Sequence, residues 1–195
     1  SAQYVATGPD SGTITFDETV IVYTGLEPIT DNTDTADRVF DDTTTNNGQE
    51  IRLKDHTDAG WMTIDSNGTG GFESISFQNP SYSLTINAGV GDDTIIIESW
   101  DASFTAELII NGGAGNDTLV GPNVPNTWTV TGLNAGNLTS TLVSGSLNAT
   151  FSEIENLTGG NQQDGFSFSA NGGVTGSIDD GPGALQITLG QFVTL

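Results

Sequence analysis

The sequence that decides the fold is "LTINAGVGDDTIII" at residues 84–97, which returns as "LIINGGAGNDTLVG" at residues 108–121. In each copy an apolar run leads into a Gly-rich turn, the turn ends in acidic or amide residues, and a second apolar run follows. The copies are 24 residues apart, and self-similarity at a fixed period is typical of solenoid proteins. About two dozen residues suffice for one coil of short strands and turns. The sequence therefore predicts an all-β chain folded as a right-handed parallel β-helix, or β-solenoid, with coils of about 24 residues.

The rest of the chain carries a strand pattern as well. Apolar residues alternate with polar ones in short runs that are bounded by Gly, Asn, Asp, Ser and Thr, which is typical of many short strands. A count of 26 Gly agrees with many tight turns. The expected strands lie at residues 13–16, 20–23, 51–54, 61–64, 74–77, 83–86, 94–97, 107–110, 127–130, 166–169 and 185–189.

The N-terminal part differs in character, and we place a division between residues 1–70 and residues 71–195. Residues 1–70 are an irregular, acidic, all-β part that forms the first coils or a cap, and residues 71–195 carry the repeat. An antiparallel sandwich is the alternative for the first part, because Asn47-Gly48 and Asn67-Gly68 suit two-residue hairpin turns.

An acidic stretch, "TDNTDTADRVFDD" at residues 30–42, is a second candidate for cation binding. It lacks the ligand order and the Gly of an EF-hand loop, so a solvated acidic loop is the preferred interpretation. Its carboxylates are Asp31, Asp34, Asp37, Asp41 and Asp42.

The charge balance excludes some partners. A formal net charge of −22 with only three basic residues argues against nucleic acid and anionic lipid surfaces, because nothing here could neutralise their phosphates. The absence of Cys removes disulfides and thiolate metal sites, and no apolar run approaches the length of a membrane span. We therefore expect no nucleic-acid partner and no membrane insertion, whereas cations suit the charge.

The Gly-Asp turns have the chemistry of a calcium site. Gly permits a positive φ and brings backbone carbonyls inward, and Asp or Asn adds a hard oxygen of the kind that Ca²⁺ prefers. One turn supplies too few oxygens, but two stacked turns share a gap. The alternative is that the carboxylates cap backbone amides, as they do in Asx turns.

The two turns also resemble a known repeat. "GGAGNDTLV" at residues 112–120 fits the nine-residue RTX pattern G-G-x-G-x-D-x-U-x at every defined position, and "AGVGDDTII" at residues 88–96 departs only at Ala88. The chain thus resembles the RTX-like, Gly-Asp-repeat segments of giant bacterial secreted surface proteins of the adhesin type. RTX rolls repeat the nonamer back to back, whereas these copies are 24 residues apart, so a wider β-helix is expected.

The resemblance implies Ca²⁺ between successive coils. Asp93 and Asp117 match the family's ligand Asp, and Asp92 and Asn116 are additional oxygen donors that the pattern leaves free. The implied metal site consists of Gly89, Gly91, Asp92, Asp93, Gly113, Gly115, Asn116 and Asp117.

An enzymatic alternative rests on "RLKDH" at residues 52–56. Arg52, Lys54 and His56 alternate and share one face of a strand, where cations and a base could serve a polysaccharide lyase or epimerase. Pairing with nearby carboxylates explains them equally well. A sugar-binding module is a further alternative, with Trp61, Trp100 and Trp128 as a stacking platform or, preferably, as core residues.

Together these observations predict a non-catalytic structural or adhesive module, not an enzyme, within a large secreted or cell-surface bacterial protein. Ca²⁺ between stacked turns would order its coils in the extracellular medium. The expected partners are Ca²⁺, neighbouring modules of the same large chain, and a polysaccharide or a cell or solid surface.

Overall fold

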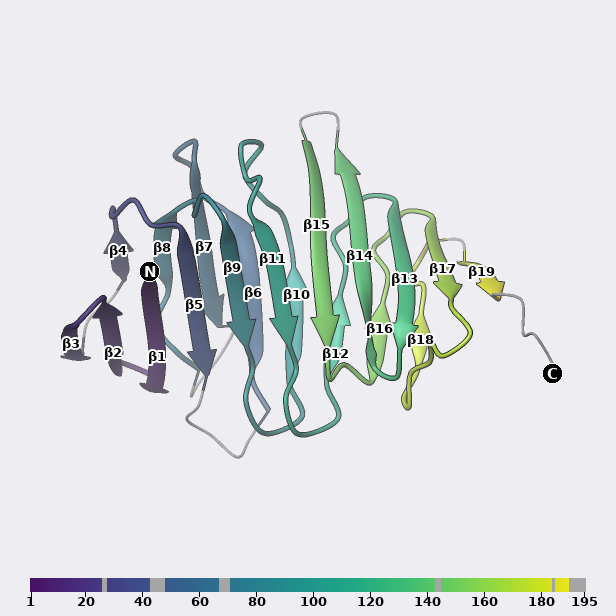
Figure 1. Cartoon of the computed structure of the whole chain (residues 1–195), viewed down its shortest axis with the longest axis horizontal. Coiled ribbons are helices and arrows are strands. Elements are labelled where there is room, and N and C mark those ends of the chain that lie inside the picture. The colour runs from purple at the N-terminus through teal and green to yellow at the C-terminus, as the bar shows by residue number, and fades with distance from the viewer. Residues whose placement is uncertain (26–27, 43–47, 67–70, 143–144, 184, 190–195) are drawn as a thin grey trace.

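A computed structural model describes residues 1–25, 28–42, 48–66, 71–142, 145–183 and 185–189, and in these ranges the chain is all-β with no helix. No helix in the described part of the chain is therefore long and apolar enough to cross a membrane. The strands form two mixed sheets, neither of which closes on itself (Figure 1). The expected strands are confirmed, because each expected range overlaps a strand.

The larger sheet, sheet A, has 11 strands and runs along the long axis of the molecule (Figure 1). Most neighbours in it are parallel, and the antiparallel exceptions are the pairs made by β2 and β14. In spatial order it contains β19 (Leu185–Leu189), β17 (Asp164–Phe168), β13 (Asn126–Gly132), β14 (Ala135–Leu142), β15 (Gly145–Ser152), β11 (Glu107–Asn111), β9 (Ser83–Asn87), β5 (Asp37–Asp42), β1 (Ala2–Gly8), β2 (Ser11–Phe16) and β3 (Thr19–Thr24).

The smaller sheet, sheet B, has 8 strands, and its only antiparallel pairs within the described residues involve β7. The chain passes between the two sheets through short corners, for example from β11 to β12 at residues 112–117. In spatial order sheet B contains β18 (Ile178–Asp179), β16 (Asn156–Thr158), β12 (Thr118–Val120), β10 (Thr94–Ile97), β6 (Glu50–Asp55), β7 (Trp61–Ser66), β8 (Ile75–Gln78) and β4 (Ile29–Asp31).

The two copies of the repeat lie directly beside each other. Leu84 of β9 pairs with Leu108 of β11, and Thr94 of β10 pairs with Thr118 of β12, each pair 24 residues apart and parallel. Most other parallel steps are longer because additional strands intervene in the sequence, whereas the steps from β16 to β18 and from β17 to β19 span 21 residues. Between β6 and β10, for example, the chain forms β7 and β8 before it returns. The 24-residue spacing thus describes this one step of the stack.

One hydrophobic core fills the space between the sheets. It forms because strand residues alternate, with every second side chain turned inward, as in β1, β5, β10 and β11. Trp128 and Phe166 stack in it with ring centroids 5.5 Å apart. Trp128 is fully buried and Trp100 is nearly so, which confirms their assignment to the core, whereas Trp61 is only partly buried.

Strands from both sides of residue 70 pair in both sheets, β5 with β9 and β6 with β10. The N-terminal part contains two tight hairpins, β1–β2 and β2–β3, but β1 is also parallel to β5. Asn47 and the predicted turn at Asn67-Gly68 lie outside the described residues.

The interpretation of residues 30–42 as a solvated loop holds only for residues 32–36, where Asp34 is exposed, and is wrong for the rest. Residues 37–42 form β5, a central strand of sheet A, and Asp31 and Asp42 are buried. Asp31 lies inside because Arg38, a fully buried guanidinium, forms an ion pair with it. A buried ion pair between two residues seven positions apart leaves no periodic trace in a sequence, so the composition suggested solvation instead.

Candidate functional site: the stacked Gly-Asp corner

The predicted Gly-Asp turns stack as one corner between the sheets. The Ala114 amide donates to the Gly89 carbonyl, and the Gly91 amide donates to the Ala114 carbonyl, each at 2.9 Å. Val90 and Ala114 form an isolated parallel bridge, and the Thr118 amide donates to the Asp93 carbonyl at 2.8 Å. The structure therefore brings together all eight residues of the implied metal site, but backbone hydrogen bonds occupy the Gly89 and Asp93 carbonyls.

Stacking explains the glycines of the second turn. A Cβ on Gly113 would lie 2.0 Å from the Gly89 carbonyl oxygen, and one on Gly115 would lie 1.8 Å from the Gly91 oxygen. Gly113 also has a φ of +96°, which disfavours other residues. The glycines thus permit one turn to lie on the next at the distance of a hydrogen bond.

An inner ladder of carboxylates joins successive layers beneath the turns. The Gln49 amide donates to Asp93 Oδ1 at 2.6 Å, the Asp93 amide to Asp117 Oδ1 at 2.8 Å, and the Asp117 amide to Glu155 Oε2 at 2.8 Å. Asp93 is 1% exposed and Asp117 is 0% exposed. Each carboxylate therefore caps the backbone amide of the layer before it, which is the alternative that Asx-type chemistry predicts.

An outer ladder runs along the exposed side of the same corner. The Asn116 amide donates to Asp92 Oδ1 at 2.9 Å, Asn156 Nδ2 donates to Asn116 Oδ1 at 3.1 Å, and the Ser177 amide donates to Asn156 Oδ1 at 2.9 Å. Asp92 and Asn116 are exposed and serve as acceptors here.

A third ladder follows the ends of the sheet A strands. Asn87 donates to Asp41, Asn111 Nδ2 donates to Asn87 Oδ1 at 2.6 Å, and Ser152 Oγ donates to Asn111 Oδ1 at 2.6 Å. The three ladders cross several layers, so polar side chains as well as backbone bonds fix the register.

The inner ladder leaves one oxygen of each Asp without a hydrogen-bond partner. Among the described residues, Oδ2 of Asp93, Asp117 and Asp164 is buried and accepts no hydrogen bond. Asp164 is the first residue of β17, at a different corner, where its Oδ1 accepts from the Asn126 amide at 3.0 Å. Burial raises the pKa of all three carboxyls, and nearby carboxylates add to the effect, so that Asp93 has a pKa of about 6.

The buried part of the corner leaves few carboxylate oxygens free for a calcium ion. Ca²⁺ is coordinated by about six to eight oxygen atoms. The buried corner presents Oδ2 of Asp93 and of Asp117, while their Oδ1 atoms and the Gly89 carbonyl bind amides. The described residues contain no group of three or more acidic or His side chains placed to hold a metal ion.

The buried carboxyls predict a stability that rises as the pH falls. Because the folded-state pKa of Asp93 is about 6 and its ordinary value is 3.8, the folded chain binds the proton first as acid is added. The free energy of unfolding should therefore increase between pH 7.5 and pH 4.5, by about 2 kcal/mol from Asp93. Asp93→Asn should flatten this rise and stabilise the chain at pH 7.5, as measured by urea unfolding across the pH range.

Asp92→Asn is the matched control, since it removes the same charge one residue earlier from an exposed position. It should leave the pH dependence in place. A pH dependence that is equal in the two variants would assign the effect to general charge repulsion and contradict a role for Asp93.

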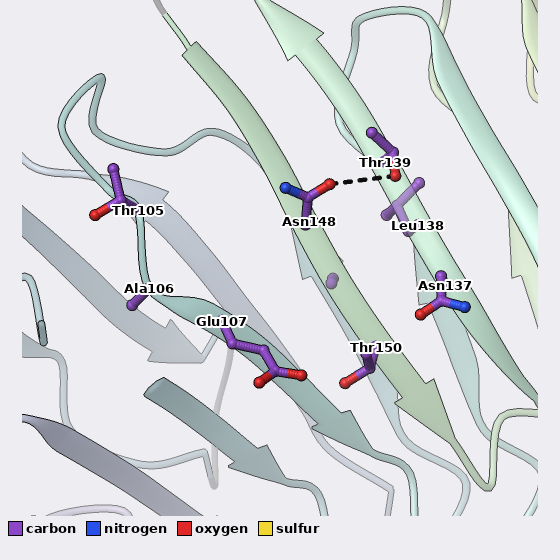
Figure 2. Close-up of a pocket in the computed structure, with 9 residues that line it drawn as sticks. Thr105, Ala106, Glu107, Asn137, Leu138, Thr139, Asn148 and Thr150 are labelled. Atoms are coloured by element: carbon purple, nitrogen blue, oxygen red, sulfur yellow. Dashed lines mark hydrogen bonds between the residues drawn. The ribbon is translucent and has the colours of Figure 1, made fainter. Parts of the chain in front are cut away.

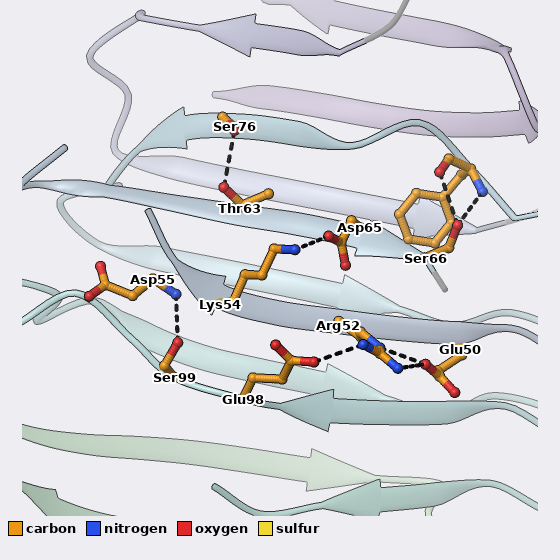
Figure 3. Close-up of polar contacts among 11 residues, drawn as sticks. Glu50, Arg52, Lys54, Asp55, Thr63, Asp65, Ser66, Ser76, Glu98 and Ser99 are labelled. Carbon is orange, nitrogen blue, oxygen red and sulfur yellow. Dashed lines mark hydrogen bonds and ion pairs between the residues drawn. The ribbon is translucent and has the colours of Figure 1, made fainter. Parts of the chain in front are cut away.

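The basic residues of the enzymatic alternative are paired (Figure 3). Arg52 contacts Glu50 at 2.5 Å and Glu98 at 3.0 Å, and Lys54 forms an ion pair with Asp65. With Arg38 on Asp31, the three Lys and Arg residues of the chain all bind its own carboxylates.

His56 follows β6 and lies apart from those pairs. Its Nδ1 accepts from the Asp58 amide at 3.0 Å, and its ring lies 5.9 Å from that of Trp61. The same nitrogen lies 3.8 Å from Asp58 Oδ2.

A shallow hollow of about 440 Å³ lies on sheet A between β11, β14 and β15 (Figure 2). Its lining offers hydroxyl and amide groups and the Glu107 carboxylate, and Thr139 Oγ1 donates to Asn148 Oδ1 at 3.4 Å. It contains no aromatic ring on which a sugar could stack. Trp100 and Trp128 are in the core, so two of the three rings of the sugar-binding alternative are not accessible to a ligand.

Sequence reasoning missed the ladder members that do not belong to the Gly-Asp pattern. Gln49, Glu155 and Asn156 join the corner from layers 38 to 44 residues away, at irregular spacing. A related signal was the recurrence of Asn as the last residue of β9 and of β11, at Asn87 and Asn111, which belong to the third ladder.

Comparison with family models, with curated proteins and with solved structures gave no match for this chain.

Proposed function

We propose that the chain is a non-catalytic structural module, a parallel β-solenoid within a large secreted or cell-surface bacterial protein. The observation that supports this most is the set of three polar ladders that join equivalent corners across successive layers. Such ladders serve to hold an extended stack in register. The net charge of −22 favours an extended, soluble segment, and the resemblance of the two Gly-Asp turns to RTX-like segments favours the bacterial cell surface.

Adhesion belongs to the same proposal. A stacked module presents one long face of sheet A, on which Thr, Asn and Glu side chains around the hollow of Figure 2 offer hydrogen bonds to a polysaccharide or another hydroxyl-rich surface. The paired state of Arg52 and Lys54 favours binding without chemistry over a lyase.

Calcium between the turns stays a prediction from the sequence, and thermal unfolding tests it. If calcium binds between the turns, Ca²⁺ should raise the Tm more than an ionic-strength-matched Mg²⁺ sample does, and an equal rise would contradict the prediction. The same comparison is made with a chelator and with the double variant Asp93→Asn plus Asp117→Asn. A calcium-specific rise that this variant loses would place calcium in the corner.

The structural assignment has its own test on the same samples. Incubation with acidic polysaccharides should release no unsaturated or reducing ends. Turnover that disappears in Arg52→Met would overturn the non-catalytic assignment.

A further inference from the structure

Five strands at the N-terminal end recur as a unit toward the C-terminal end. In the first unit β1 pairs antiparallel with β2, β2 with β3, and β1 parallel with β5, while β4 lies in sheet B. In the second unit β13, β14, β15, β17 and β16 take the same positions with the same directions. The chain therefore contains an internal structural repeat that is larger than the 24-residue step.

The registers of the two units agree. Tyr4 pairs with Ile14 in the first unit, and Trp128 pairs with Leu138 in the second. The irregularity near the end of β1, between Ala6 and Gly8, returns at the same place in β13.

The packing of the third strand agrees as well. A Cβ on Gly12 would lie 2.4 Å from the Tyr23 hydroxyl, and one on Gly136 would lie 2.9 Å from the Phe151 ring. The residues that directly follow the two strands, Gly25 and Glu153, both have a positive φ. Thus β3 corresponds to β15, and by the same offset β4 corresponds to β16.

The units differ in what covers them. The outer side of β15 pairs with β11, and that of β16 pairs with β12, so one strand–corner–strand coil covers both. In the described residues β3 and β4 are the last strands of their sheets, at the same end of the molecule (Figure 1).

The uncovered end is apolar. Ile21 of β3 is 46% exposed, whereas Ala149, its counterpart in β15, is 2% exposed beneath β11. Val20 and Val22 are 59% and 73% exposed. An exposed apolar edge strand is a template for pairing with another strand.

We infer that the β3/β4 edge is a docking surface for a parallel coil of the type formed by residues 107–120. This coil has an Ile/Leu strand, an Asn-Gly-Gly-x-Gly-x-Asp corner and a second short apolar strand. By the register of β11 on β15, Leu108 of such a coil would lie against Ile21 and Ile110 against Tyr23. By the register of β12 on β16, Leu119 of such a coil would lie against Ile29. This inference rests on the proposed structural function. It adds the face that binds, the β3/β4 edge, and the kind of segment that binds there.

Charge favours a coil over a second copy of the chain. A second copy would bring another net charge of −22 to this end, whereas residues 107–124 contain two acidic residues, Glu107 and Asp117. One hydrogen bond of the second unit cannot form at the β3/β4 edge. In the second unit the Asn156 amide donates to the Asp117 carbonyl at 2.9 Å, whereas the corresponding residue of the first unit is Pro28, which has no amide hydrogen. Pairing on β3 therefore carries most of the interaction.

The internal repeat supplies the experiment. In the second unit residues 107–124 lead through Pro125 into β13, and Ser1 occupies the position of Pro125 ahead of β1. We would fuse a second copy of residues 107–124 directly ahead of Ser1 of the full chain. The control fusion carries Leu108→Asp and Ile110→Asp in the added segment only.

The added coil should slow hydrogen exchange of the β3 amides that do not bond to β2 by about tenfold or more, and raise the Tm by about 5 °C, relative to the control fusion. Equal exchange in the two fusions would overturn the docking inference and leave the ladder-based function untouched. Concentration-dependent association of the original chain that protects β3 would overturn it in favour of a second copy. Turnover of a polysaccharide, by contrast, would overturn the function without affecting the exchange result.

Discussion

Arg38→Met is expected to destabilise the chain by about 3–5 kcal/mol, because it leaves the Asp31 carboxylate buried without its cation. Arg38 is 0% exposed and binds both Asp31 and the Tyr4 hydroxyl, and its Nε donates to the Gln78 carbonyl at 2.9 Å. Its guanidinium also lies over the Phe77 ring, 5.3 Å from the centroid. Urea unfolding at pH 7 measures the difference.

The same contacts determine the pKa of the Asp31 carboxyl. Burial disfavours ionisation of Asp31, but hydrogen bonds from Tyr4 and Thr33 and the charge of Arg38 outweigh it and lower the pKa of the carboxyl. Burial also raises the pKa of the Tyr4 hydroxyl, which therefore stays a donor. The cluster is thus a fully connected polar network within an apolar core, and such networks are costly to break at one member.

Arg52→Met is the matched control for Arg38→Met. The Arg52 side chain is 29% exposed and pairs with Glu50 and Glu98 on the surface of sheet B, so its loss should change the unfolding free energy by less than about 1 kcal/mol. Equal effects of the two substitutions would contradict the role given to the buried pair. If Arg38→Met does not fold, the double variant Arg38→Met plus Asp31→Asn should recover soluble protein, because it leaves no lone buried charge.

Gly113→Ala is the second large effect, with an expected destabilisation of about 3 kcal/mol or more. The new Cβ would lie 2.0 Å from the Gly89 carbonyl oxygen, so the stacked turns must separate, and the φ of +96° adds strain. Chemical denaturation of the variant measures the change in unfolding free energy.

Gly60→Ala separates the two causes. Gly60 has a φ of +84° but no atom within 4 Å of a new Cβ, so its substitution should cost about 1 kcal/mol from backbone strain alone. Losses of the same size at both glycines would show that the close stacking of the corner contributes nothing.

The sequence predicted the residues of the candidate site better than it predicted their chemistry. The Gly-Asp spacing identified Asp93 and Asp117 as neighbours, and the register of β10 on β12 places them side by side. It could not identify what their oxygens bind, since the partner of each Oδ1 is a backbone amide of another layer. Residue type determines which atoms can accept a hydrogen bond, whereas the stacking of the layers determines which donor lies within reach of them.

The sequence by itself determined the all-β class, most strand positions and the one 24-residue step, because alternation and turn residues act over a few neighbouring positions. The tertiary structure alone decided that residues 37–42 form a central strand, that Asp31 is buried on Arg38, and that β3 and β4 end their sheets. These outcomes depend on contacts between residues far apart in the chain, or on a single compensating charge, and neither produces a local pattern. Burial of a polar residue is set by the partner that meets it, and that partner is known only once the layers are stacked.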